Sequence, residues 1–281
     1  MTPLNPILII GKHGKTGSRV NTLLKNQGID VRAVSRSTSL SFNWEDQSTW
    51  AKALSGTQSA YVTYQPDLAL PQAESTIRDF VSLAKSMGVK HIVLLSGRGE
   101  AGAQRAENVL IESGLTWNVV RASWFYQNFS ESFMAEGIVS GTLALPADGT
   151  VEPFVDADDI AEVAVAALTQ PELHNRLFEV TGPEALTFAQ CVECISKACG
   201  RSISYNYVPI DPYIEQLNKQ GIPKDYQWLL RELFTEVFDG RNSNVMNGIE
   251  DALGRPPRNF ASYAAKAAQN KAWTNTDLAA S

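Results

Sequence analysis

Short apolar runs alternate with amphipathic segments along the first half of the chain. Runs rich in β-branched and aliphatic residues span Ile7–Ile10, Val31–Val34, Ala60–Thr63, His91–Leu95 and Trp117–Val120. Segments with helical spacing separate them. Continuous apolar strands that alternate with helices are typical of a parallel sheet covered on both faces. The pattern therefore predicts five strands of such a sheet.

The helical segments between these strands have clear ends. The spacing predicts helices over Lys15–Asn26, Pro71–Met87 and Gln104–Glu112, which stop at or before Gly28, Gly88 and Gly114, respectively. Glycine after the last periodic residue is a common helix C-terminal signal. With right-handed crossovers, this order of elements predicts an α/β fold with a Rossmann-type, doubly wound parallel sheet.

The alternation of apolar runs and helical segments ends at about residue 122. A cluster of aromatic residues is followed by a stretch rich in Gly and Pro up to residue 153. A helix over 159–168 and a strand over 177–180 are expected to return to the sheet, and a strand is expected at 203–208 among helices. We therefore predict a Rossmann domain over residues 1–155, joined by 159–182. A smaller, mostly helical substrate-binding part is predicted over 185–281, with contributions from 124–150.

A glycine-rich loop connects the first predicted strand to the first predicted helix. It has the pattern G-x-x-G-x-x-G and comprises Gly11, Lys12, His13, Gly14, Lys15, Thr16 and Gly17. In this position glycines let the backbone approach a dinucleotide diphosphate, and the helix N-terminus supplies N–H donors and a positive dipole. The alternative is that the glycines serve only a tight turn. A Walker A loop would require glycine at position 9, which is Ile9.

The end of the second strand indicates which dinucleotide is bound. NAD sites place an acidic residue there to accept a hydrogen bond from the ribose 2′-hydroxyl. Here the strand ends in Ser35 and Arg36, which suit a 2′-phosphate, whereas Asp30 lies at the opposite end of the strand. The predicted cofactor is therefore NADP(H), with Lys12, Lys15 and Arg19 adding positive potential. The alternative for Arg36 is a solvated surface cation.

Composition and charge narrow the choice of partners. The 281 residues are 44% hydrophobic, and 24 basic against 30 acidic residues give a net charge of −6. Without a block of Lys or Arg, nucleic acid is not expected as a partner. The N-terminal apolar run is too short for a signal peptide or a membrane span. We expect a soluble cytoplasmic protein with a small-molecule substrate, either a monomer or a homodimer.

Two further groups of residues suggest metal chemistry but have simpler explanations. Cys191 and Cys194 form a C-x-x-C, yet Thr187 and Gln190 form a capping box that places Cys191 on the buried face of a helix. No other Cys or His pair supplies the remaining zinc ligands. The aspartates at 156, 158 and 159 are expected to cap the next helix or to be solvated or hydrogen-bonded. No metal is predicted.

Three segments resemble the NmrA-like atypical short-chain dehydrogenases/reductases. They are SGLTWNVVRASWFYQN at 113–128, FVDADDIA at 154–161 and LGRPP at 253–257, and the resemblance extends over most of the chain. Members of this family include NADPH:quinone oxidoreductases, triphenylmethane reductases and ergot-alkaloid iminium reductases. Other members have lost catalysis and act as nucleotide-sensing regulators.

The resemblance also implies which residues contact the ligands. Besides the glycine loop, it implies cofactor contacts from Ser35, Arg36, Asn43, Trp44, Thr63, Tyr64, Pro66, Ser96, Gly97, Arg98, Ala122, Ser123, Trp124 and Phe125. Trp124, Phe125, Asn128 and Phe129 are the predicted substrate pocket, although the aromatic side chains could equally be core. These loops follow the carboxyl ends of strands, where open α/β sheets bind ligands.

One catalytic feature of the short-chain dehydrogenases is missing. Their Tyr-x-x-x-Lys pair has no counterpart between Ser96 and Glu112, where there is neither tyrosine nor lysine. Tyr64 is the one phenol expected near the nicotinamide, a weak candidate for a proton donor. We therefore predict an NADPH-dependent reductase that transfers hydride directly to a quinone, dye or iminium compound. The alternative is a non-catalytic, NADP(H)-sensing regulator.

Overall fold

The computed structural model describes residues 5–274, and the chain forms two compact units. The first unit contains the residues up to Ala122, Ala157–Val180 and Asn247–Arg255. The second contains Ser123–Asp156, Thr181–Met246 and the chain from Pro256 onward. The chain therefore passes between the units several times.

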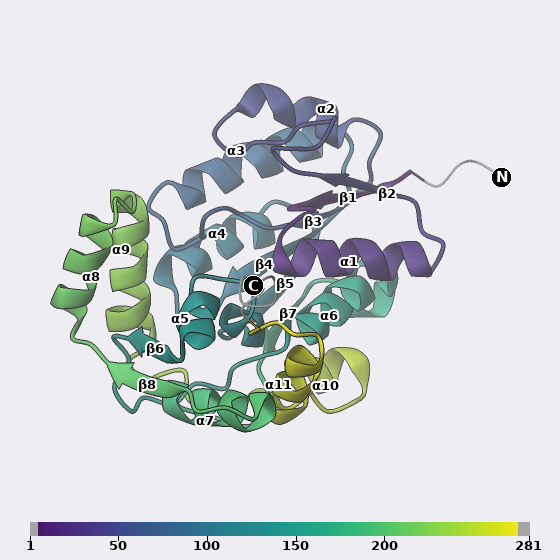
Figure 1. The fold of residues 1–281 in the computed structure, drawn as a ribbon. Helices are drawn as coiled ribbons and strands as arrows, with labels where there is room; N and C mark the ends of the chain where they lie inside the picture. The colour runs from purple at the N-terminus through teal and green to yellow at the C-terminus, as the bar shows by residue number, and fades with distance from the viewer. Residues whose placement is uncertain (1–4, 275–281) are drawn as a thin grey trace. The chain divides into compact units, whose positions relative to one another are not determined.

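A six-stranded parallel sheet forms the centre of the first unit (Figure 1). Its strands are β1 (Ile7–Ile10), β2 (Val31–Val34), β3 (Ser59–Val62), β4 (His91–Gly97), β5 (Thr116–Ala122) and β7 (Arg176–Val180), in the order β2-β1-β3-β4-β5-β7. The Rossmann-type sheet predicted from the sequence is confirmed. The bounds of β1 and β2 match the prediction. β4 and β5 are longer, because they pair without interruption from His91 beside Thr116 to Gly97 beside Ala122.

Helices cover both faces of this sheet. They are α1 (Lys15–Asn26), α2 (Trp50–Leu54), α3 (Ala73–Ser86), α4 (Ala101–Ile111), α6 (Ala157–Thr169) and α10 (Gly248–Leu253). α2, α3 and α4 pack on the face that carries Leu8, Ile10 and Leu94. α1 and α6 lie side by side on the opposite face (Figure 1). The predicted bounds of α1 are confirmed, and α3, α4 and α6 differ from the prediction by one to three residues at each end.

α10 packs directly on β7, the edge strand of the sheet. A Cβ atom at position 248 would lie 2.2 Å from the carbonyl oxygen of Glu179, so only glycine permits this approach. Residues 247–255 thus belong to the first unit although the chain on either side belongs to the second.

The second unit is mostly helical. It contains α5 (Met134–Ser140), β6 (Thr142–Leu145), α7 (Phe188–Cys199), β8 (Ser204–Tyr207), α8 (Ile210–Lys219), α9 (Lys224–Glu232) and α11 (Phe260–Gln269), with a single π-helical turn at Leu233–Val237. β6 and β8 form a two-stranded parallel sheet. The strand predicted at 203–208 is β8, whereas its partner β6 lies in the stretch that had no predicted element.

The start of α7 confirms the predicted capping box. The Thr187 hydroxyl accepts a hydrogen bond from Gln190 N, and the Gln190 side chain accepts one from Thr187 N. Cys191 is buried and burial raises the pKa of its thiol, so it behaves as a small apolar side chain. Within residues 5–274 no group of three or more His, Cys, Asp or Glu side chains is placed to hold a metal ion.

A buried histidine lies at the start of β4. His91 Nε2 is 2.9 Å from Asn118 Oδ1, and the His91 and His174 rings are 4.4 Å apart. Burial lowers the pKa of His91 from 6.5 to about 4; the Asn118 hydrogen bond opposes this shift, and the charge of His174 adds to it. His91 is therefore neutral in the folded chain at neutral pH.

We expect this histidine to make the fold less stable in mild acid. Between pH 6.5 and 4 the unfolded chain binds a proton at His91 that the folded chain does not, so the free energy of unfolding falls by up to about 3 kcal/mol as the pH is lowered. Urea unfolding at several pH values measures this slope. His91→Gln should reduce it, whereas His13→Gln, at an exposed position, should not. An equal slope in wild type and His91→Gln would contradict the assignment.

Candidate functional site

The glycine loop is a compact turn held against the ends of β1 and β2. The N–H groups of Gly11 and Lys12 both donate to the Val34 carbonyl at 3.0 Å, and Gly14 N donates to the Gly11 carbonyl at 2.8 Å. Gly11 has φ +93°, which favours glycine. A Cβ atom at Gly17 would lie 2.2 Å from the Gly11 carbonyl oxygen. The geometry itself therefore requires glycine at positions 11 and 17.

The first turn of α1 faces this loop with its backbone donors. Gly14 occupies the N-cap position and has no side chain with which to cap the helix, and the first turn contains no acidic residue. The first-turn N–H groups of a helix have no carbonyl partner within the helix, and these groups and the positive end of the helix dipole both favour an anion there. The loop has the form of a cradle for a phosphate group.

The end of β3 closes one side of the loop. Thr63 Oγ1 donates a hydrogen bond to the Ile10 carbonyl at 3.0 Å. A Cβ atom on Gly11 would lie 2.4 Å from Thr63 Oγ1. The Trp44 indole N–H donates to the Thr63 carbonyl at 3.0 Å, and the rings of Trp44 and Tyr64 are 5.1 Å apart. Asn43 precedes Trp44, and its carbonyl accepts a hydrogen bond from the Trp50 indole at 2.8 Å. The structure thus brings Gly11, Thr63, Trp44 and Tyr64 together.

The turn after β2 is rich in hydroxyl groups. Phe42 N donates to the Ser35 carbonyl at 3.0 Å, which closes the turn, and Thr38 Oγ1 donates to the carbonyls of Ser35 and Leu40. Ser35 Oγ lies 3.3 Å from Ser37 Oγ. Arg36 is exposed and forms no ion pair with any residue in the range 5–274. Its guanidinium is therefore available to an added anion.

The end of β4 carries a buried polar network that the sequence did not predict. The Ser96 hydroxyl donates to Glu107 Oε1 at 2.5 Å. Arg121 on β5 binds both oxygens of Glu107 and also pairs with Glu179 at 3.0 Å. The hydrogen bond to Glu107 is the largest cause that raises the pKa of Arg121. Glu107 is 1% exposed, so the hydroxyl proton of Ser96 is committed to this carboxylate.

The end of β4 and the loop after β3 carry further residues of the predicted cofactor site. A Cβ atom at Gly97, the last residue of β4, would lie 2.1 Å from Glu100 Oε1, the flexible end of a side chain that would have to shift. Burial raises the pKa of Asp67 in the loop after β3, where its carboxylate accepts a hydrogen bond from Ala69 N at 2.8 Å. Pro66 in the same loop is exposed, and Arg98 is 8% exposed.

The segment that follows β5 belongs to the second unit. The Trp124 ring is partly exposed and lies 5.2 to 5.7 Å from the rings of Phe188, Phe234 and Phe238. Hydrogen bonds of 2.8 Å from Val155 N to the Trp124 carbonyl and from Tyr126 N to the Val155 carbonyl fix the backbone here. The structure therefore holds the Trp124 side chain and main chain in place while leaving part of the ring exposed.

The neighbours of Trp124 differ in exposure. Phe129 is fully buried in the aromatic core of the second unit, whereas Phe125 and Asn128 are partly exposed. Ser123 is buried and donates to Glu152 Oε1 at 2.5 Å. Of the predicted pocket, Trp124, Phe125 and Asn128 thus keep surface that a ligand could contact.

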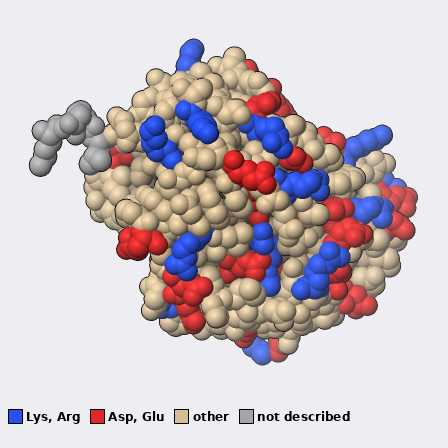
Figure 2. Space-filling view, turned by 180° about the vertical axis from the view of Figure 1, so that it is seen from behind, with Lys and Arg blue, Asp and Glu red and all other residues tan. Residues whose placement is uncertain are grey.

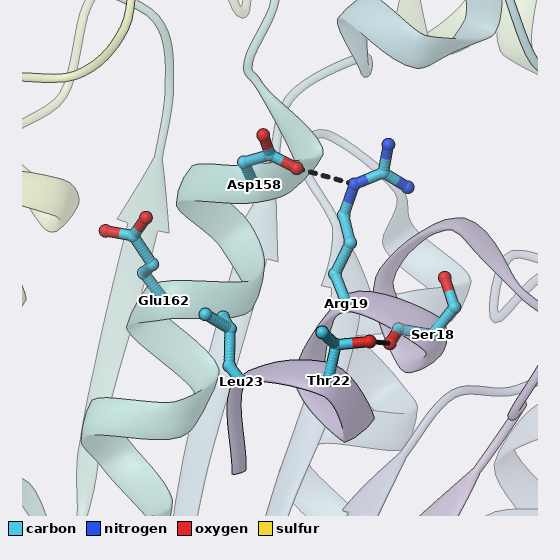
Figure 3. Close-up of a pocket in the computed structure, with 6 residues that line it drawn as sticks. All are labelled: Ser18, Arg19, Thr22, Leu23, Asp158 and Glu162. Atoms are coloured by element: carbon cyan, nitrogen blue, oxygen red, sulfur yellow. Dashed lines mark hydrogen bonds and ion pairs between the residues drawn. The ribbon is translucent and has the colours of Figure 1, made fainter. Parts of the chain in front are cut away.

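A hollow of about 460 Å³ lies between α1 and α6 (Figure 3). Its lining residues are Ser18, Arg19, Thr22, Leu23, Asp158 and Glu162. Arg19 Nε donates to Asp158 Oδ1 at 2.7 Å, and Arg255 pairs with Asp159 and Glu162. Asp156 accepts a hydrogen bond from Gln127 at 2.8 Å, so each of the three clustered aspartates is hydrogen-bonded.

Figure 2 shows one face of the molecule, on which basic and acidic side chains of the described residues are interspersed. This face has no broad basic area. None of the helices within residues 5–274 is both long and apolar enough to cross a lipid bilayer.

Comparisons with known proteins agree with this geometry. The chain is 29% identical to Prestalk A differentiation protein A of Dictyostelium discoideum, over 94% of this chain and 93% of the relative. It is 31% identical to agroclavine dehydrogenase of Claviceps fusiformis, over 92% and 95% of the two chains. The fold is similar to that of an Escherichia coli NADPH-dependent quinone oxidoreductase complexed with NADPH, with a TM-score of 0.73, 18% identity and coverage of 92% and 99%. Residues 4–263 match the model of the NmrA-like family, and the chain therefore belongs to the NmrA-like family.

Proposed function

We propose that this chain is an NADPH-dependent reductase of a conjugated or cationic small molecule of the quinone, dye or iminium type. The observation that carries the proposal is the cradle formed by Gly11, Gly17 and the first turn of α1, with the unpaired Arg36 at the end of the neighbouring strand. The names of the dehydrogenase and quinone oxidoreductase described above support a redox role.

The residues of the first unit fit an NADP(H) molecule. The loop backbone and the first-turn N–H groups would hold the diphosphate, because no side chain caps this helix end and its first turn contains no acidic residue. Arg36 and the hydroxyls of the turn after β2 would bind the 2′-phosphate. Asn43 and Trp44 would border the adenosine, Thr63 and Pro66 would add further contacts, and Tyr64, Ser96, Gly97, Arg98 and Ala122 would lie toward the nicotinamide. When bound, the cofactor supplies a hydride at its nicotinamide ring.

The chain contributes positioning rather than acid–base chemistry. It has no Tyr-x-x-x-Lys pair, and the Ser96 proton is already donated to Glu107. A quinone, cationic dye or iminium accepts hydride without a placed proton donor, and water can supply any proton that follows. Holding the acceptor against the hydride donor would then account for most of the rate.

Trp124 is the residue we propose for holding the acceptor. Three phenylalanine rings fix its orientation, and the part of its ring that stays exposed suits a flat conjugated molecule. Trp is also the aromatic side chain that best attracts a cation, as an iminium substrate would require. Phe125 and Asn128 would complete this surface.

The second candidate function is an NADP(H)-sensing regulator without catalysis. The commitment of the Ser96 hydroxyl to Glu107, together with the missing Tyr-x-x-x-Lys pair, favours it, since neither of these groups can then protonate a substrate. The Dictyostelium relative is named as a differentiation protein and not as an enzyme, which also supports this candidate.

Arg36→Glu tests the choice of cofactor. The substitution replaces an attraction to the 2′-phosphate by a repulsion, so the affinity for NADPH should fall at least about tenfold while that for NADH changes little. Calorimetric titration of both cofactors measures this. Lys52→Glu makes the same charge change at another exposed position and should have a much smaller effect. Equal losses of NADPH and NADH affinity in Arg36→Glu would refute a 2′-phosphate contact.

The two candidate functions differ in turnover. NADPH consumption, followed by absorbance with a panel of quinones, azo and triphenylmethane dyes and iminium compounds, should reveal at least one acceptor. Trp124→Ala should then raise the KM for that acceptor about tenfold or more and weaken NADPH binding much less. Tight binding of oxidised and reduced cofactor with no turnover of any acceptor would instead favour the regulator.

A further inference from the structure

Arg19 connects two helices at the rim of the hollow between α1 and α6. Figure 3 shows its side chain reaching from α1 to Asp158 on α6. Its Nε donates to Asp158 Oδ1 at 2.7 Å, and one terminal nitrogen donates to the Lys15 carbonyl at 2.7 Å. The two side chains are 24% and 28% exposed, so the contact is partly shielded from water.

Asp158, the carboxylate partner of Arg19, lies on α6, a helix that other ion pairs hold in place. Asp158 is in the first turn of α6, and the next residue, Asp159, is fully buried and binds Arg255 at 2.6 Å. Arg255 also binds Glu162 one turn further along. α6 therefore offers Arg19 a rigid point of attachment.

The Lys15 carbonyl is the part of α1 that this attachment controls. It belongs to the same planar peptide group as the N–H of Thr16, and the two bonds point in opposite directions. A guanidinium that holds the oxygen also directs the Thr16 N–H toward the glycine loop. A charged donor on the oxygen further polarises the peptide and strengthens its N–H as a donor.

We infer that Arg19 is a positioning residue for the cofactor diphosphate. It ties the first turn of α1 to α6 through Lys15 and Asp158, and so orients the backbone donors that the diphosphate would meet. This inference rests on the proposed function, because it requires that NADPH bind at the glycine loop.

A purely electrostatic role for Arg19 and a positioning role predict opposite changes in the NADPH affinity of the variant Asp158→Asn. If Arg19 acted only by its positive charge, removing the negative charge of Asp158 would strengthen the binding of an anionic cofactor. If Arg19 acts by position, the same change replaces its charge-assisted hydrogen bond to α6 by a weaker one, loosens the attachment and weakens binding. Asp158→Asn therefore distinguishes the two roles by the sign of the change.

The experiment is a calorimetric titration of the full chain with NADPH. We expect Asp158→Asn and Arg19→Lys each to weaken NADPH binding about fivefold, and Asp158→Glu to restore most of the loss. Glu74→Gln removes a carboxylate that pairs with Arg78 on α3 and Arg105 on α4, away from α1, and should not change NADPH binding. Adenosine 2′-monophosphate has no diphosphate, so its affinity, measured by competition, should be the same in all variants.

Hydrogen exchange gives a structural readout that does not depend on activity. Peptides covering residues 14–18 should exchange faster in Asp158→Asn than in wild type, because the first turn is less restrained. Peptides from α3 should be unchanged.

Tighter or unchanged NADPH binding by Asp158→Asn would overturn the inference and leave the proposed function standing. Weaker binding of both NADPH and adenosine 2′-monophosphate would mean a general loss of structure and would also overturn it. If the wild-type chain bound no NADPH, the proposed function would fall and the inference with it.

Discussion

The contact between Gly11 and Gly17 is the constraint on which the rest of the candidate site depends. The Gly11 carbonyl oxygen occupies the space that a side chain at position 17 would need, while a side chain at Gly11 would strike Thr63. The ends of β1 and β3 and the start of α1 therefore meet closely, with the Gly11 backbone packed between Gly17 and the Thr63 hydroxyl. This close approach leaves the first turn of α1 open at the point where β1 ends, which is where an open α/β sheet binds its ligand.

Some polar side chains around this point form buried hydrogen bonds and ion pairs within the protein, whereas Arg36 is exposed to solvent. Ser96 and Arg121 converge on the buried Glu107, and leaving that carboxylate unpaired would cost several kcal/mol. Arg36, in contrast, has no ion-pair partner among residues 5–274 and stands on a turn built from hydroxyl side chains. The same sheet edge thus carries residues that maintain the structure and, in Arg36, an exposed cation outside the ion pairs of the described residues.

The second unit shows a similar division among its aromatic residues. Phe129 is fully buried against Phe154, Phe188 and Phe260, so it contributes to the core. Trp124 is held by neighbouring rings yet keeps an exposed part. Spacing along the chain could not separate these two roles, because both residues belong to one short aromatic stretch, and burial depends on helices that are distant in sequence.

Periodicity and end signals in the sequence determined the order of strands and helices, the exact extent of β1, β2 and α1, and the position of the glycine loop. These features depend on local propensities and on the alternation of buried faces, which a single segment carries by itself. Only the tertiary structure decided that Ser96 binds Glu107, that β6 pairs with β8, that α10 returns to β7, and that Arg19 reaches Asp158, 139 residues away. Each of these contacts joins segments that do not influence each other until the chain has folded.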